Sequence, residues 1–579
     1  MAAGPIFYRE ALTVPRQIKH YLIRSGYLFA LLVLLYTTSQ ATFGWQVYRS
    51  PTALAQFGEL VFQIFALIQL TLALAVSLVF AAGNVSLEKD KKTLVLLLVT
   101  DLRDRELVLG KLAASILQIA VLQAVSIPIF MMLTLLGGTT LQQVLWVSLL
   151  TFTSSLLAGS WGTLVAFWKE KTFQTLAYGL LGLVVLIGGV EIAALFLNPA
   201  SPVTDWVLVM NPYRALFRIL APFAQASGTT AIGIQAWDAV IVQSVMVVVM
   251  NVFTIFMLRV WNPSRVTYQT IQKEKDLSEK TQAARNVWSQ PILWREMMTR
   301  AYGRQMIYIK LGYLAIAGLT GYGIYQLTTT GDLGGDLILG MISLPGFLLI
   351  LLSLLSMMLV NSQAVTAITT ERDGGTLELL LVTNITAREF ILGKLGGVFY
   401  NLKEAILAPI AIMWLMFGLQ TLTTEAAVLL TLGYLVLIAF SAMTGLHSGL
   451  SYPNSRRAIS TSLGTMFFLF IGIFICMLLI VEARSSFALQ LPSFLLFILG
   501  GSIGLWLSLT HRNPSPALTI TAAILPFLTF YAITAFLLGG SLDVFLSISF
   551  AYGFAITSML VPAISEFDIA IGRQNAERR

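Results

Sequence analysis

One stretch of this sequence occurs twice, and in both places it lies between long apolar segments. Residues 88–111 read EKDKKTLVLLLVTDLRDRELVLGK, and residues 371–394 read ERDGGTLELLLVTNITAREFILGK. The two stretches align without a gap and are identical at 14 of 24 positions. Apolar runs of roughly 20 residues, long enough to cross a bilayer as a helix, flank each copy. Each copy is therefore predicted to be a loop between two membrane spans, on the same side of the membrane.

The composition also indicates an integral membrane protein. Of the 579 residues, 57% are hydrophobic and 11% are charged, and the mean hydropathy is +0.81. The single cysteine, Cys476, lies in an apolar run, which excludes an intrachain disulfide and a cysteine-based metal site. The net charge of +8 does not indicate nucleic-acid binding, because the Lys and Arg residues are sorted by loop. The first 24 residues are mixed and amphipathic, so no cleavable signal peptide is expected.

The expected fold is an all-α polytopic membrane protein made of two pseudo-symmetric six-span units. The first unit is predicted to span the membrane at 26–45, 57–85, 107–135, 142–168, 173–197 and 239–260. The second is predicted to span it at 310–328, 337–369, 390–418, 425–450, 459–481 and 545–562. Residues 493–538 are expected to form a re-entrant hairpin on the outside, which gives twelve spans. If His511-Arg512 is instead a cytoplasmic turn, the count is fourteen.

The distribution of Lys and Arg predicts the orientation. In the first half and the linker, the segments on one side of the predicted spans hold 18 of these residues, and the segments on the other side hold three, namely Arg49, Arg214 and Arg218. Because cytoplasmic loops carry the excess of positive charge, the N- and C-termini and both duplicated loops are predicted to be cytoplasmic. On the outside, Asn211-Pro212 is expected to begin a short helix that extends through Leu220.

A second repeat marks the start of each unit. Residues 5–10 read PIFYRE and residues 291–296 read PILWRE. With the duplicated loop, this repeat divides the chain into a first unit at 1–261, a polar cytoplasmic linker at 262–290, and a second unit at 291–579. Residues 5–24 are expected to form an amphipathic helix at the membrane interface.

The duplicated loop has an apolar ridge between two charged stretches. Glu88 and Asp90, or Glu371 and Asp373, begin it, and Thr93 or Thr376 is expected to cap a short helix by accepting a backbone N–H. Each ridge contains four leucines and a valine, which are Leu94, Leu96, Leu97, Leu98 and Val99 in one copy and Leu377, Leu379, Leu380, Leu381 and Val382 in the other. Such a ridge must bury itself in lipid headgroups or in another protein. The conserved spacing of polar residues between the two copies favours a protein partner.

The pattern E-(K/R)-D-x-x-T-L-x-L-L-L-V-T, followed by R-E-x-x-L-G-K, resembles the signature loop of the ABC transporter type-2 permeases. In that family this loop joins the second and third spans of each unit and forms the coupling helix that docks on a cytosolic ATPase. The resemblance implies a coupling role for Glu88, Asp90, Thr93, Leu94, Leu97, Arg105, Glu106, Lys111, Glu371, Asp373, Thr376, Leu377, Leu380, Arg388, Glu389 and Lys394. The first copy departs from the pattern at Lys91-Lys92 and Val95, where the second has Gly374-Gly375 and Glu378, so the two docking sites are not expected to be equivalent.

The resemblance implies that the chain is the membrane-spanning subunit of an ATP-driven exporter in a bacterial inner membrane. Its partners would be the lipid bilayer and cytosolic ABC ATPase subunits, expected to number two. ATP and Mg would bind to those partners, because the chain lacks the G-x-x-x-x-G-K-[ST] motif that cradles phosphates. Only His20, His447 and His511 are present, without a metalloprotease or hydrolase motif, so the chain is not expected to be an enzyme. Charge substitutions at Leu97 and Leu380 are expected to uncouple ATP hydrolysis from transport.

Polar residues within spans are candidates for a substrate path, because they are costly to bury in lipid. Gln63, Gln69, Lys403 and Glu404 are the candidates. The alternative for the glutamines, including Gln118 and Gln123, is hydrogen bonding between helices, and for Lys403 it is extension of the side chain to the inner interface. Glu59, Glu191 and Glu482 are expected at hydrated span ends.

Two other functions remain open. One is an ATP-driven mechanical assembly that extracts lipids or lipoproteins from the membrane. The other is a secondary transporter, a class that is also built from internal repeats but depends on ion-binding carboxylates near the middle of the membrane.

Overall fold

The computed structural model describes residues 4–13, 18–43, 50–191, 202–220, 236–262, 287–298, 305–329, 343–381, 383, 385–482, 487–511 and 515–565. Within these ranges the regular secondary structure is entirely helical. Twelve of the described helices are long and apolar enough to cross a membrane, or thirteen if one bent pair is counted as a single span. The chain is therefore an all-α, multi-pass membrane protein, as predicted.

The first half contains each of its six predicted spans. Its helices are α1 (Gly4–Thr13), α2 (Ile18–Phe43), α3 (Pro51–Asp90), α4 (Thr93–Val99), α5 (Asp104–Leu136), α6 (Leu141–Trp168), α7 (Thr172–Val184), the π-helical η2 (Val185–Gly189), α9 (Pro202–Val209), α10 (Pro212–Leu220) and α11 (Ala236–Trp261). The short helix that was predicted to begin at Asn211-Pro212 is α10. Its start is held by Glu191, which accepts from Asn211 Nδ2 at 2.7 Å and from Arg214 Nε at 2.7 Å.

The second half repeats this plan up to its fifth span and has two additional long helices before its last. Its helices are α13 (Pro291–Met298), α14 (Gln305–Thr329), α15 (Leu344–Asp373), α16 (Thr376–Leu381), α17 (Ala387–Asn401), α18 (Lys403–Gly418), α19 (Thr424–Ser451), α20 (Ser455–Glu482), α21 (Phe487–Leu509), α22 (Pro516–Leu537) and α23 (Ser541–Ser565). α3 ends at Asp90 and α15 ends at Asp373, 283 positions later. A Cβ at Gly162 would lie 2.8 Å from the carbonyl oxygen of Leu78, and one at Gly445 would lie 2.7 Å from that of Asn361. The same close helix approach therefore occurs at equivalent positions in both halves.

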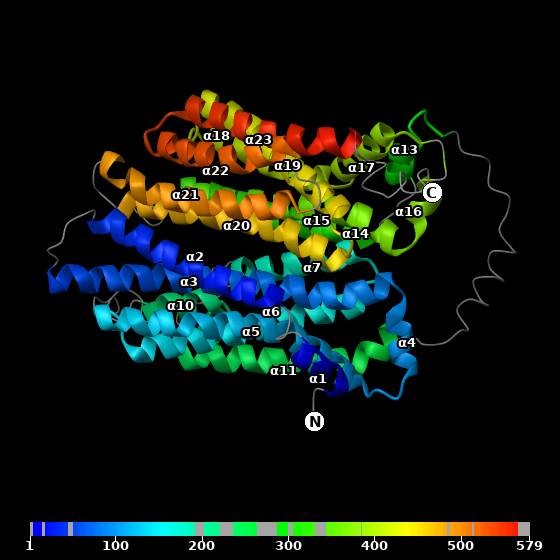
Figure 1. Ribbon diagram of the computed structural model, residues 1–579, viewed down its shortest axis with the longest axis horizontal. Helices are drawn as coiled ribbons and strands as arrows, with labels where there is room; N and C mark the ends of the chain where they lie inside the picture. The colour runs from blue at the N-terminus through cyan, green and yellow to red at the C-terminus, as the bar shows by residue number, and fades with distance from the viewer. Residues whose placement is uncertain are drawn as a thin grey trace, which may run out of the picture.

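The end of the second half differs from the prediction. The expected hairpin at 493–538 is wrong, because α22 is itself long and apolar enough to span a membrane. α21 lies along α2 and α22, and α22 lies along α23 (Figure 1). His511, which follows α21, stacks its ring on Tyr452 at 4.7 Å between centroids, and Tyr452 lies between α19 and α20. The end of α21 at His511 is thus on the side of the duplicated loops, as the fourteen-span alternative requires.

The two halves pack through corresponding spans (Figure 1). α3 of the first half lies against α20 of the second, and α15 of the second lies against α7 of the first. In each pair the second span of one half meets the fifth span of the other. One core cluster of buried side chains contains residues of both halves. Residues 263–286 of the predicted linker lie outside the described residues.

Candidate functional site

The first duplicated loop begins with three charged residues, Glu88, Lys89 and Asp90, that end α3. Adjacent residues on a helix point about 100° apart, so each of the three side chains faces a different neighbour. Glu88 forms an ion pair with Lys111 on α5. Lys89 reaches the end of α6, and Asp90 reaches the start of α7. We call these three residues the first hub, because they join the end of one span to three others.

The charges of the first hub match the helix ends that they contact. Lys89 donates from Nζ to the carbonyl oxygens of Phe167 at 2.6 Å and Lys169 at 2.9 Å, at the C-terminal end of α6. Asp90 accepts from Thr172 Oγ1 at 2.5 Å, at the N-terminal end of α7. A cation at a helix C-terminus and an anion at a helix N-terminus both complement the helix dipole. The two helix ends therefore account for a positive charge at residue 89 and a negative charge at residue 90.

The second hub, Glu371-Arg372-Asp373 at the end of α15, makes equivalent contacts. Glu371 accepts from Lys394 Nζ on α17 at 2.6 Å. Arg372 donates from Nη1 to the carbonyl oxygen of Gly449 in the last turn of α19 at 2.8 Å. Asp373 accepts from the hydroxyl of Ser455, the first residue of α20. Lys394 and Ser455 each lie 283 positions after their counterparts Lys111 and Thr172. Both copies of the motif therefore have one architecture.

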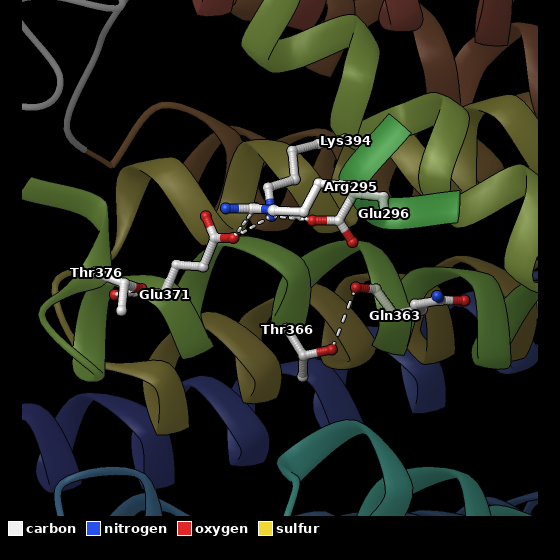
Figure 2. A network of polar contacts seen from close by, with 7 residues as sticks. All are labelled: Arg295, Glu296, Gln363, Thr366, Glu371, Thr376 and Lys394. Atoms are coloured by element: carbon white, nitrogen blue, oxygen red, sulfur yellow. Dashed lines mark hydrogen bonds and ion pairs between the residues drawn. The ribbon is translucent and has the colours of Figure 1, made fainter. Parts of the chain in front are cut away.

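The second hub also joins the half-start helix α13 (Figure 2). The side chains of Arg295, Glu296, Glu371 and Lys394 form a charge cluster. Lys394 Nζ lies 2.7 Å from Glu296 Oε1, and Arg295 contacts both carboxylates. The Lys394 side chain is only 2% exposed and that of Glu296 is 7% exposed. Burial works against the charged carboxylate, but the ion pairs with Lys394 and Arg295 hold the pKa of Glu296 below its ordinary value.

The equivalent helix of the first half packs in the corresponding place. α1 lies against α5, as α13 lies against α17. Gly4 of α1 adjoins Glu106 on α5. The side chain of Glu10, the counterpart of Glu296, lies outside the described ones. In the second half, the six-residue motif that starts the unit and the loop motif thus belong to one charge cluster. The sequence analysis treated these two motifs separately.

The apolar ridge of the first loop forms α4 and is divided between two faces. Leu94 and Leu98, one helical turn apart, are buried against Leu107 and Phe167 and attach the helix to the bundle. Leu97 packs partly against the same cluster. The opposite face presents three apolar side chains to the outside, with Val95 47%, Leu96 67% and Val99 70% exposed. Helix α4 therefore has a fixed side and an available side.

The second ridge forms α16 and is attached in the same way. Leu377 is buried, and Leu380 packs partly on the core. The side chains of Leu379 and Leu381, and all of Val382, lie outside the described part of the chain.

The threonines that begin the two helices act differently from the prediction. Thr93 does not cap α4 by accepting an N–H. Its hydroxyl instead donates to the carbonyl oxygen of Glu88 at 3.3 Å, and that of Thr376 donates to Glu371 O at 3.1 Å. The reason is the backbone, because the residue before Thr93 is Lys92, with φ of 58° in the left-handed region. The chain turns there from the long helix into the short one, and Thr closes the long helix.

The charged pairs that follow the ridges cap the next span. Glu389 accepts from the backbone N–H of Thr386 at 3.0 Å, and Glu106 accepts from that of Arg103 at 3.3 Å. These are the reciprocal half of a capping box at the starts of α17 and α5. Arg105 and Arg388 are exposed beside them. Their exposed guanidinium groups can contact a partner, whereas the carboxylates are used locally.

The predicted substrate-path residues make separate contacts. Gln69 accepts from Ser126 Oγ on α5 at 2.9 Å, which is the interhelical bonding considered as its alternative. Gln63 donates to Glu59 Oε1 at 3.3 Å, along α3. Glu404 forms an ion pair with Lys310 on α14, with Nζ 2.8 Å from Oε2. The path itself stays a prediction.

Comparison of the chain with protein-family models finds no match, and comparison with curated proteins finds none either.

Proposed function

We propose that this protein is the membrane-spanning subunit of an ATP-driven exporter, with two permease units fused in one chain. The observation that carries the proposal is the repeated hub. In each half, three consecutive charged residues join the end of the second span to three other spans, and the half-start helix packs against the third span. A loop that served only as a connector would not need these bonds twice at equivalent positions.

In this proposal the energy comes from separate ATPase subunits, expected to number two, which bind ATP and Mg. They would dock on α4 and α16. The exposed side of α4, formed by Val95, Leu96 and Val99, supplies an apolar contact for such a partner. Exposed Arg105, near the start of α5, supplies a positive charge for the same partner.

The contacts of the hubs suggest how a displacement of the short helix would reach the transport path. A push on α4 would move Glu88, Lys89 and Asp90, which bind the ends of α5, α6 and α7. α7 packs against α15 of the other half. Closure of the ATPases would thus change the packing of the second and fifth spans where the halves meet, and the path between them would alternate its access.

The docking assignment is tested by charge substitution on the exposed side of α4. We expect Leu96→Asp with Val99→Asp to abolish co-purification with the ATPase subunits that this proposal requires, and to leave membrane insertion intact. These positions are sharper tests than Leu97 and Leu380, because both of those pack partly on the core. The control is Leu538→Asp. Leu538 is 87% exposed and follows α22 at the opposite end of the bundle, so this variant should co-purify normally.

The proposal fails if the double variant still co-purifies with the ATPase and the reconstituted complex couples hydrolysis to transport as the unsubstituted protein does.

A further inference from the structure

The second half contains a charged site that the first half lacks. The third span of the second half is bent by 57° between α17 and α18, and Lys403 and Glu404 follow the bend directly. In the first half the equivalent span, α5, is one continuous helix. Residues 283 positions earlier than Lys403 and Glu404 are Ala120 and Val121, which carry no charge. Lys403 and Glu404 are therefore not part of the repeated architecture, whereas Lys310 has a basic counterpart in Arg24, 286 positions earlier.

The bend places Lys403 and Glu404 next to each other at the start of α18, and Glu404 pairs with Lys310 on α14. Lys310 on α14 donates from Nζ to Glu404 Oε1 at 3.0 Å, and this pair is only partly buried, at 24% and 28% exposed. Lys403 is exposed, and its Nζ lies 4.8 Å from the ring centroid of Tyr400. The two lysines and one carboxylate leave a net charge of +1.

This site faces lipid rather than the space between the halves. Tyr308 and Leu311 on either side of Lys310 are 65% and 57% exposed, and Leu407 on α18 is 58% exposed. In a membrane-spanning bundle, such exposed apolar side chains contact acyl chains. An uncompensated cation on this surface is costly unless an anion accompanies it.

The depth of the site corresponds to a lipid headgroup. α14 begins at Gln305, whose carbonyl oxygen accepts from Tyr178 on α7 at 3.4 Å, and α7 begins at Thr172 beside the first hub. Lys310 thus lies about 7 Å from the α14 end that is on the side of the coupling loops. Exposed tyrosines at this level are typical of the boundary between headgroups and acyl chains.

From these observations we infer that Lys310, Lys403 and Glu404 form a binding site for the phosphate of an anionic lipid in the leaflet on the side of α4 and α16. Lys403 supplies the excess positive charge. Glu404 holds the ammonium group of Lys310, which can donate a second hydrogen bond to the phosphate. Ala120 and Val121 stand in the first half where Lys403 and Glu404 stand in the second, so we expect the two halves to differ in the lipid that they hold. This inference does not depend on the proposed function, because its test measures lipid binding without an ATPase.

The test is a lipid titration of the full-length, delipidated protein in detergent, followed by native mass spectrometry. Phosphatidylglycerol and phosphatidylcholine are the two probes. We expect the protein to retain one phosphatidylglycerol with an affinity about five-fold higher than that for phosphatidylcholine, which is the effect of one basic residue near an anionic surface. In Lys403→Gln the two lipids should bind with about equal affinity, and Lys403→Arg should retain the preference for phosphatidylglycerol.

Two controls separate the site from general charge effects. The exchange Lys310→Glu with Glu404→Lys keeps the net charge and the ion pair, so the preference should persist. Ala120→Gln, at the equivalent position of the first half, should leave the preference unchanged. An unchanged preference in Lys403→Gln, or an equal loss in Ala120→Gln, overturns the inference. If soluble glycerol phosphate displaces the lipid at an equal concentration, the ligand is a free phosphate and the assignment to lipid is wrong.

Discussion

Lys394 and Glu296, 98 positions apart in the sequence, form an ion pair with 2.7 Å between Nζ and Oε1. The pair fastens the half-start helix α13 to α17, and Lys394 extends the connection to Glu371 at the end of α15. Three separate segments of the second half are thus held by one ammonium group that is almost fully buried. An ammonium group in such a place is stable only while its carboxylate partners are present.

The first prediction concerns this ammonium group. Lys394→Met leaves Glu296 and Glu371 buried without their main counter-charge, and removal of one partner of a buried pair typically costs about 3 kcal/mol or more. We expect a markedly lower midpoint of thermal unfolding in detergent. Arg457→Ala, which removes an exposed cation, should change the midpoint little. Adding Glu296→Gln to Lys394→Met should recover part of the loss, and strictly additive effects would contradict a direct pairing.

The second prediction concerns pH. Because the folded-state pKa of Glu296 is below its ordinary value of 4.5, its pairing stabilises the fold fully above pH 4.5, and this contribution is lost as pH falls through the lower, folded-state pKa. We therefore expect the protection factors of the α13 amide hydrogens, which are corrected for the intrinsic pH dependence of exchange, to fall on acidification below pH 4.5. In Glu296→Gln the fall should be smaller, since the titrating group is absent. An identical pH profile in the variant would show that other carboxylates control this helix.

The third prediction uses the difference between the two loops at the turn before each short helix. Lys92 has φ of 58° and its counterpart Gly375 has φ of 70°, both in the left-handed region. A side chain disfavours that conformation by about 1 kcal/mol, whereas glycine adopts it freely. Lys92→Gly should therefore stabilise the first loop, and Gly375→Lys should destabilise the second. Amide exchange in α4 and α16 measures both, and changes of the same sign would contradict the assignment.

The sequence predicted the spans and the duplicated loops well, because the length of an apolar run and the repetition of a motif can both be read directly from the residues. It also showed that the first loop departs from the second at Lys92, but not why, since the left-handed backbone there is visible only in three dimensions. The contacts of Lys89, Asp90 and Asp373 in the two hubs could not be predicted from the sequence. Lys89 binds carbonyl oxygens, which carry no sequence signal, and Asp90 and Asp373 bind a threonine and a serine in stretches that otherwise differ.

The misplaced hairpin at 493–538 has a similar explanation. The short segment Asn513-Pro514 resembles Asn211-Pro212, and this likeness suggested that the two regions correspond. The second half, however, contains the additional long helices α21 and α22 before its last span, and α22 is held to α23 by Thr521 Oγ1, which donates to Ser558 Oγ at 2.8 Å. A local likeness of a few residues could not reveal an insertion of two packed helices.

The last prediction tests whether the hubs act through their hydroxyl partners. Thr172→Val keeps the shape of the side chain but leaves Asp90 without its donor, and a carboxylate deprived of a hydrogen bond at a partly buried site typically costs about 1–3 kcal/mol. Thr172→Ser keeps the hydroxyl and should be nearly neutral. In the second half Ser455→Ala should weaken the start of α20 and Ser455→Thr should not, because Asp373 accepts from that hydroxyl in the same way. Hydrogen exchange at the first turns of α7 and α20 reports each bond separately. If Thr172→Ser is damaging and Thr172→Val is not, the methyl group rather than the hydroxyl holds this junction, and the hub is a packing contact.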